Sequence, residues 1–296
     1  MMEVARTREE LAKALVMLRC GSDGANASVA LVPTMGALHA GHVSLIRLAR
    51  ELADHVIVSV FVNPLQFGPG EDYERYPRAF DADLRTCRDE KVSLVFAPSA
   101  EVVYPEPQLV GVDPGPMGEA YEGASRSGHF SGVLTVVMKL FQLTRPDLAV
   151  FGQKDAQQLA LVRRMVRDLD LPVHVVAGAT VRDPDGLAVS SRNVYLSAEE
   201  RTAALALSRA LRAGERVSGG GASAVREAAL SVLRAEPRLL LDYLALVEPE
   251  TFADVSDGYE GEAVLAVAAT VGTTHLIDNV PVRVDRRPDP DPPSVA

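Results

Sequence analysis

Residues 31–42 read Leu31-Val32-Pro33-Thr34-Met35-Gly36-Ala37-Leu38-His39-Ala40-Gly41-His42. They combine a short apolar segment, a turn containing Pro and Gly, and the start of an amphipathic helix. The free N–H groups at a helix start, the positive end of its dipole and glycines that allow close backbone approach all favour a bound anion. His39 and His42 are placed to donate to phosphate oxygens. The stretch therefore predicts a strand, a phosphate-binding turn and a helix.

The histidine pair has two other interpretations, which stay open at this point. His39 and His42 could be solvated side chains in a first helical turn, or half of a metal site. A metal would need further ligands, and neither Cys20 nor Cys87 has a plausible ligand neighbour in the sequence. We therefore expect no metal bound by protein side chains.

Apolar strands and amphipathic helices alternate on both sides of this stretch. Strands are expected over 29–33, 55–62, 93–97, 148–151 and 173–176, with a short one near 109–112. Helices are expected over 3–20, 41–53, 81–90, 131–143 and 155–169. The segment 56–62 is nearly continuously apolar, which is typical of a parallel strand covered on both faces. The alternation predicts an α/β fold with a Rossmann-like, doubly wound parallel sheet.

The chain changes in character beyond residue 180. A turn-rich polar segment over 181–193 carries two hydroxyls and an arginine suited to phosphate oxygens. Ser197 and Glu200 form a capping box that should start a helix. The remaining expected elements are a helix to residue 213, a second helix over 222–235, and strands over 239–247, 263–270 and 276–284. We predict a larger domain over 1–180, a small C-terminal α+β domain over 181–285 and a disordered tail over 286–296.

Composition restricts the class of protein. The chain has 296 residues, 47% of them apolar, which is enough for a full core. A net charge of −10 without a basic stripe argues against nucleic acid as a partner. No run of about eighteen apolar residues is present, so no membrane span is expected. Two cysteines far apart in the sequence fit a reducing compartment, and we expect a soluble cytoplasmic protein.

Several polar residues lie at expected strand ends or helix starts. Asn63 and Gln66 follow the strand 55–62, where open α/β sheets bind ligands, although loop amides more often cap turns. Arg126 and His129 precede a helix, and surface charge is the plain alternative for both. Lys154 follows Gly152 in a chain with four lysines and twenty-six arginines, so a lysine at this glycine turn indicates a need for a compact point charge. A solvated lysine remains the alternative.

Four blocks of sequence resemble the pantoate–β-alanine ligase family of the nucleotidyltransferase superfamily, whose signature is His-x-Gly-His. The blocks are Pro33-Thr34-Met35-Gly36 with His39-Ala40-Gly41-His42, Phe61-Val62-Asn63-Pro64 with Gln66-Phe67, Phe151-Gly152-Gln153-Lys154-Asp155-Ala156-Gln157-Gln158-Leu159, and Ser190-Ser191-Arg192-Asn193. The resemblance extends from about residue 3 to residue 284, with the blocks in family order. Standard mononucleotide and dinucleotide loops are absent from the sequence.

The resemblance implies a two-step reaction. Pantoate attacks the α-phosphate of ATP to give pantoyl adenylate and pyrophosphate, and the amine of β-alanine then displaces AMP to form pantothenate. It also implies a homodimer, and ATP chemistry implies Mg²⁺ held mainly by phosphates and water. The segment 190–192 belongs to the small C-terminal domain, so we expect that domain to close over ATP as a lid.

The resemblance also assigns residues. Those implied in catalysis are His42 as proton donor, with His39, Lys154 and Arg192. Those implied in ATP binding are Met35, Gly36, Ala37, Leu38, His39, Ala40, Gly41, His42, Gly152, Gln153, Lys154, Asp155, Val181, Val189, Ser190, Ser191 and Arg192. Those implied in binding pantoate and β-alanine are Gln66, Gln158, Asn63, Arg126 and His129. Val189 and Gln153 depart from the residues that many relatives have there, Met and Glu.

Two other functions stay open. A nucleotidyltransferase with a different small acceptor would share the histidines and the Ser-Ser-Arg segment but would not require Gln66 and Gln158. A nucleotide-sensing module without chemistry would bind ATP and turn nothing over.

Overall fold

The computed structural model describes residues 2–20 and 27–285. These residues form two compact units. Unit 1 comprises the described residues up to Arg182 together with Val189–Ser191, and unit 2 comprises Asp183–Ala188 and the described residues from Arg192 onward. The predicted tail over 286–296 lies outside the described residues.

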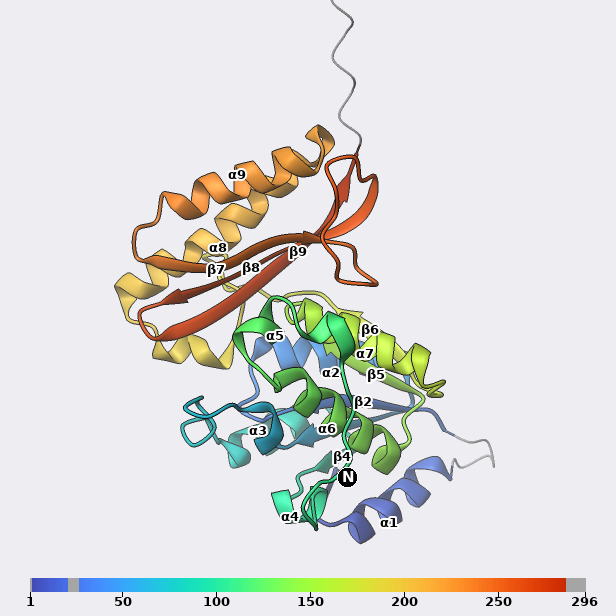
Figure 1. Ribbon diagram of the computed structural model, residues 1–296. Helices are drawn as coiled ribbons and strands as arrows, with labels where there is room; N and C mark the ends of the chain where they lie inside the picture. The colour runs from blue at the N-terminus through green and yellow to red at the C-terminus, as the bar shows by residue number, and fades with distance from the viewer. Residues whose placement is uncertain (1, 21–26, 286–296) are drawn as a thin grey trace, which may run out of the picture. The chain divides into compact units, whose positions relative to one another are not determined.

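Unit 1 is built on a six-stranded parallel sheet (Figure 1). Its strands are β1 Glu3–Ala5, β2 Val29–Thr34, β3 His55–Val60, β4 Leu94–Phe96, β5 Leu148–Gly152 and β6 His174–Gly178, in the order β1-β4-β3-β2-β5-β6. The chain runs outward from β2 to β4 on one side and continues through β5 and β6 on the other. The loops after β2 and β5 therefore diverge at a topological switch point, where such sheets bind ligands. The predicted doubly wound sheet is confirmed.

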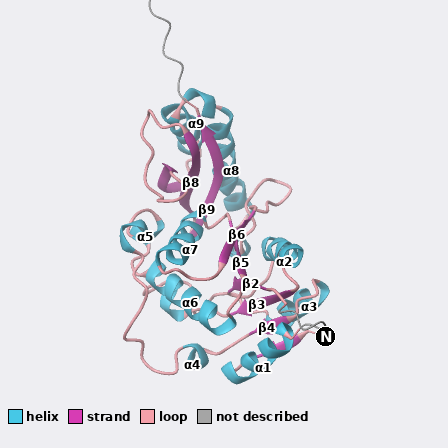
Figure 2. Ribbon diagram, turned by 90° about the vertical axis from the view of Figure 1, so that its right-hand side faces the viewer, coloured by secondary structure: helices cyan, strands magenta, loops and turns pink. Residues whose placement is uncertain are grey.

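Helices cover both faces of this sheet (Figure 2). They are α1 Arg8–Arg19, α2 Ala40–Leu52, α3 Phe80–Asp89, α6 His129–Thr144 and α7 Ala156–Asp168. Alternate residues of β2 point to opposite faces: Leu31 packs in the core that includes α1, α6 and α7, and Val32 packs in the core that includes α2 and α3. Burial on both faces explains why the strands read as continuous apolar runs.

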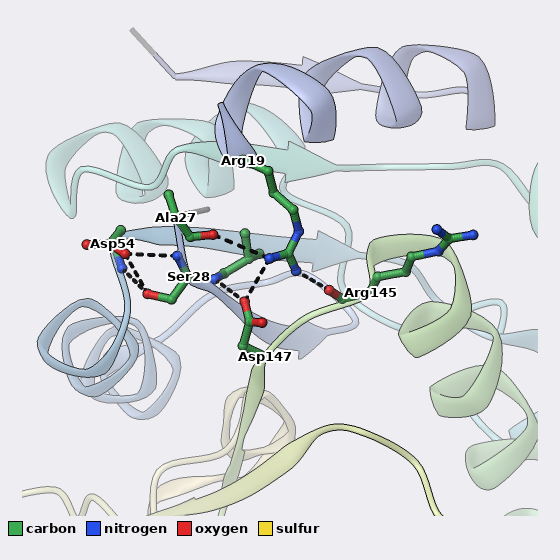
Figure 3. Close-up of polar contacts among 7 residues, drawn as sticks. Arg19, Ala27, Ser28, Asp54, Arg145 and Asp147 are labelled. Atoms are coloured by element: carbon green, nitrogen blue, oxygen red, sulfur yellow. Dashed lines mark hydrogen bonds and ion pairs between the residues drawn. The ribbon is translucent and has the colours of Figure 1, made fainter. Parts of the chain in front are cut away.

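The amino-terminal edge of the sheet is fixed by the side chain of Asp147 (Figure 3). Its Oδ2 accepts the backbone N–H of Val29 at 2.7 Å and Nη1 of Arg19 at 3.0 Å. Arg19 also donates to the carbonyls of Ala27 and Arg145. These contacts tie the end of α1 to the starts of β2 and β5.

Unit 2 contains two helices and an antiparallel sheet (Figure 1). The helices are α8 Ala198–Arg216 and α9 Ala222–Arg234, and the strands are β7 Leu239–Val247, β8 Gly261–Val271 and β9 Thr274–Val284, in that order across the sheet. The predicted capping box is present: Ser197 Oγ accepts Glu200 N–H at 3.2 Å, and Glu200 accepts Ser197 N–H at 2.8 Å. Unit 2 is the α+β part of the fold that the sequence predicted.

Short helical segments make up the remaining regular structure described. They are α4 Ala100–Val103, α5 Glu122–Ser125, and the 3₁₀ helices η1 Pro64–Gln66, η2 Gly115–Gly118, η3 Ser191–Tyr195 and η4 Ser218–Gly220. None of the described helices is both long and apolar enough to cross a membrane.

One expected element is wrong in part, and another is absent. The helix predicted over 3–20 begins only at Arg8, because residues 3–5 pair with β4 as strand β1. Pairing with a distant strand leaves no trace in local periodicity. The strand expected near 109–112 is absent: Leu109 and Val110 are exposed, and the N–H of Val112 donates to Thr135 Oγ1 instead of to a strand.

Candidate functional site

The turn between β2 and α2 has an uncommon backbone. Gly36 has φ +81°, and Ala37, which is not a glycine, has φ +50°. Thr34 Oγ1 accepts the N–H of Gly36 at 3.1 Å and donates to the carbonyl of Ser59 at 2.7 Å. Thr34, the last residue of β2, thereby links Gly36 of the turn to β3, and the following residues lead directly into α2.

His39 and His42 lie together at the start of α2. Their rings stack with centroids 4.0 Å apart, and the N–H of His39 donates to Nδ1 of His42 at 3.3 Å. An imidazole that accepts at Nδ1 carries its proton on Nε2 when neutral. Burial, followed by the charges of His39 and Lys154, lowers the pKa of His42 to about 3. At neutral pH His42 is therefore an uncharged hydrogen-bond donor through Nε2.

Lys154 lies in the turn between β5 and α7. Strand β5 is the neighbour of β2 in the sheet, so the two turns leave adjacent strand ends. The charge of Lys154 acts on the pKa of His42, which places the two side chains in one electrostatic environment. The N–H of Gln153 donates to the carbonyl of Gly178 at 2.8 Å, which fixes this turn against β6. The structure thus brings the two predicted glycine turns together.

Asn63 and Gln66 belong to a hydrogen-bonded group after β3. Asn63 Nδ2 donates to Gln66 Oε1 at 3.2 Å, and Gln66 Nε2 lies 3.0 Å from the sulfur of Met35. Tyr104 O–H donates to Asn63 Oδ1 at 2.8 Å, and Asn63 Nδ2 also donates to the carbonyl of Gly132. Asn63 is buried, so its amide orients Gln66 beside Met35. Met35 belongs to the turn between β2 and α2, residues 35–39, which is the predicted phosphate turn.

Arg126 and His129 lie on the other side of Gln66. His129 Nδ1 is 2.8 Å from the carbonyl oxygen of Gln66, and Arg126 Nη1 is 3.1 Å from His129 Nε2. Arg126 makes a bidentate ion pair with Glu71, at 2.9 Å and 2.6 Å. Burial would raise the pKa of the Glu71 carboxyl, but the hydrogen bonds and charge of Arg126 outweigh it and lower that pKa. Arg126 is therefore a paired cation here.

The two adjacent glutamines at the start of α7 differ in environment. Gln157 is buried: its Nε2 donates to the carbonyls of Met117 and Ala120, and its Oε1 accepts the N–H of Glu122. Gln158, the glutamine assigned from the resemblance, is half-buried on the same first turn. Gln157 anchors the segment before α6, which leaves Gln158 as the candidate for substrate.

The polar segment after β6 is divided between the units. Val189 N–H donates to the carbonyl of Val181 at 3.0 Å, and Ser191 Oγ lies 3.2 Å from Tyr76 O–H, all within unit 1. A cavity of about 660 Å³ is lined by Val181 and by residues of α2 that include Ala40. Val181 therefore lies beside the helix start that carries His39 and His42. Arg192 belongs to unit 2, and its role stays a prediction.

One residue that contacts the turn between β2 and α2 was not identified from the sequence. Asp83 of α3 is buried, and its carboxylate accepts the N–H groups of Ala37 and Leu38 in the phosphate turn. An acidic residue in a first helical turn is ordinary, so nothing local distinguishes Asp83. Within residues 2–20 and 27–285, no cluster of three or more His, Cys, Asp or Glu side chains is arranged to hold a metal ion.

The fold and site define a class: an open parallel α/β protein with a cluster of nitrogen donors at its switch point, suited to a phosphorylated ligand. The family model for pantoate-beta-alanine ligase matches residues 3–281. The chain belongs to the pantoate-beta-alanine ligase family, and it is an enzyme of that ligase class.

Individual relatives agree with this assignment. The chain is 65% identical over 264 residues to a pantothenate synthetase of Thermobifida fusca, covering 86% of this chain and 89% of the relative. It is 55% identical to one of Salinispora arenicola, covering 96% and 99%.

Solved structures agree as well. The pantothenate synthetase of Thermus thermophilus superposes with a TM-score of 0.87 at 48% identity, covering 94% of this chain and 99% of that one. The pantoate-beta-alanine ligase of Francisella tularensis, complexed with beta-gamma ATP and beta-alanine, superposes with a TM-score of 0.76 at 31% identity, covering 95% and 97%.

Proposed function

We propose that this ligase joins pantoate and β-alanine through a pantoyl adenylate. A carboxylate oxygen of pantoate forms a bond to the α-phosphorus of ATP, and the bond from that phosphorus to the bridging oxygen breaks, releasing pyrophosphate. The amine of β-alanine then forms the C–N bond at the acyl carbon. AMP leaves with the electron pair of the broken C–O bond, and the amine gives up its proton.

The juxtaposition of His42 and Lys154 at neighbouring strand ends carries this proposal. Negative charge grows on pyrophosphate as it leaves, so donors fixed at that position stabilise the transition state more than the ground state. Lys154 supplies a full charge, and neutral His42 supplies an N–H dipole from Nε2. Both remain effective in an acidic chain because their influence is local.

Gln66, Asn63 and Gln158 are the proposed substrate contacts. The bonds from Asn63 to Gln66 fix the amide orientation, which fits recognition of the hydroxyl and carboxylate groups of pantoate. Arg126 and His129 contact the backbone carbonyl of Gln66 and position this residue at the same end. The nucleophiles belong to the substrates, so positioning and electrostatics provide the catalysis.

The finer parts of the proposal concern the nucleotide. Mg²⁺ enters as part of MgATP, bound by phosphates and water. Ser190, Ser191 and Arg192 add hydroxyl and guanidinium contacts to the phosphates, with unit 2 acting as a lid. A cytoplasmic homodimer completes the proposal.

The test is product formation from ATP, pantoate and β-alanine, with each omitted in turn. We expect AMP and pantothenate only with all three, and pantoate-dependent exchange of labelled pyrophosphate into ATP without β-alanine. Pyrophosphate release with a phosphorylated acceptor instead of pantoate would favour the other nucleotidyltransferase. ATP binding without turnover for any substrate pair would identify a sensing module.

A further inference from the structure

Asp83 makes a close contact with the phosphate turn from another element. The residue lies on α3 and is 2% exposed. Its Oδ2 accepts the N–H of Ala37 at 3.0 Å, and its Oδ1 accepts the N–H of Leu38 at 2.7 Å. Both carboxylate oxygens therefore bind consecutive amides of the turn.

The turn needs this support because of its backbone conformation. Ala37 has φ +50°, in the left-handed region that a residue with a Cβ adopts only at a cost in free energy. Gly36, at φ +81°, packs so closely that an added Cβ would lie 3.0 Å from Asp83 Oδ2. Hydrogen bonds from amides to a carboxylate are charge-assisted and strong, so they offset the cost at Ala37.

The backbone amides of residues 36–39 are engaged within the protein. Gly36 N–H donates to Thr34, Ala37 and Leu38 donate to Asp83, and His39 N–H donates to His42. The amides of Ala40 and Gly41 are in the first turn of α2, where no acceptor lies one turn earlier in the helix. An anion at this helix start therefore has those amides as its backbone donors.

We infer that Asp83 is a positioning residue for nucleotide binding: its carboxylate holds residues 36–38 so that the first turn of α2 and His42 face the phosphates. The identity of the anion as ATP rests on the proposed function. Asp83 itself makes no contact with substrate, since both of its oxygens bind the turn.

The main test is Asp83→Asn, with Ala37→Gly as the second member of a double-mutant cycle. Asparagine keeps one acceptor but turns an NH₂ group toward a backbone donor. We expect KM for ATP, and Kd for a non-hydrolysable ATP analogue, to rise about 10- to 100-fold, the loss expected for one hydrogen bond to a charged group. We expect KM for β-alanine and the folded fraction to change less than about twofold.

Ala37→Gly separates positioning from a merely structural role. Glycine adopts positive φ without the Cβ penalty. Adding Ala37→Gly to Asp83→Asn should therefore recover about threefold or more of the lost ATP affinity. Asp81→Asn is the matched control, because Asp81 is an exposed acid on the same helical turn.

Amide exchange in the ligand-free wild type provides a measurement that needs neither activity nor a variant. We expect the N–H groups of Ala37 and Leu38 to be protected before any nucleotide is added, and to exchange faster in Asp83→Asn. Rapid exchange in the wild type, unchanged ATP affinity in Asp83→Asn, or no recovery in the double variant would each overturn the inference. Failure of the proposed reaction would leave the exchange result standing, so the two failures are distinguishable.

Discussion

The two ends of strand β2 are each tied to another element by a carboxylate, with different consequences. At the amino end Asp147 accepts the N–H of Val29, and at the carboxyl end Asp83 accepts the N–H groups of Ala37 and Leu38. At the amino end the carboxylate is also paired with Arg19, whose remaining bonds go to backbone carbonyls (Figure 3). The contacts of Asp147 and Arg19 at the amino end are thus made to other groups of the protein.

The carboxyl end uses the same device but leaves donors for a ligand. Asp83 accepts two backbone N–H groups of the turn. The first-turn amides of α2, Nε2 of His42 and the charge of Lys154 are the donors proposed to contact a ligand at this end. A carboxylate that accepts backbone N–H groups therefore does not by itself mark a site. The two ends differ in function because only the carboxyl end continues into a helix start with fixed donors.

The largest expected effect comes from removing the charge at the carboxyl end. Lys154→Ala should lower the rate of adenylate formation 10²- to 10³-fold, because a preorganised donor to the leaving pyrophosphate is lost. Pantoate-dependent pyrophosphate exchange measures this rate. Lys13→Ala, at an exposed lysine of α1, is the control and should leave the rate unchanged. A loss below tenfold for Lys154→Ala would contradict the catalytic role assigned to the carboxyl end of the sheet.

An intermediate effect is expected from breaking the amino end. Asp147→Ala leaves the buried N–H of Val29 without its acceptor, so the free energy of unfolding should fall by about 1–3 kcal/mol. Denaturant unfolding measures this change, and kcat per folded molecule should stay the same. Asp147→Asn retains an acceptor oxygen and should cost less than half as much. If Asp147→Ala lowered kcat and left the free energy of unfolding unchanged, the purely structural role assigned to the amino end would be wrong.

A pH dependence is expected at the carboxyl end alone. The pKa of His42 is lowered to about 3 in the folded protein, against about 6.5 in an unfolded chain. Between these values the unfolded chain binds the proton and the folded protein does not, so folding stability attributable to His42 is lost as pH falls from about 6.5 toward 3. Unfolding free energies of wild type and His42→Gln, compared across this range, should converge or cross as the pH is lowered. A constant difference between them would contradict the depressed pKa.

Much of this organisation could be predicted from local sequence. The apolar runs of β2, β3 and β5, the helix that starts after His39 and the capping box of Ser197 and Glu200 all follow from periodicity and capping. The candidate residues Asn63 and Gln66 follow from their position after a strand. Strand β1 could not be predicted, because three residues paired with a distant strand resemble the start of the helix that follows them.

The sequence by itself determined which segments become strands, helices and glycine turns, and it placed His39, His42 and Lys154 at helix starts, because these depend on residues within one or two turns of each other. Only the tertiary structure decided that the turns after β2 and β5 leave neighbouring strands, that burial makes His42 an uncharged donor, and that Asp83, 46 residues beyond Ala37, supports the turn. Those outcomes depend on the order of strands in the sheet and on desolvation, and neither is encoded in the spacing of residues along a single element.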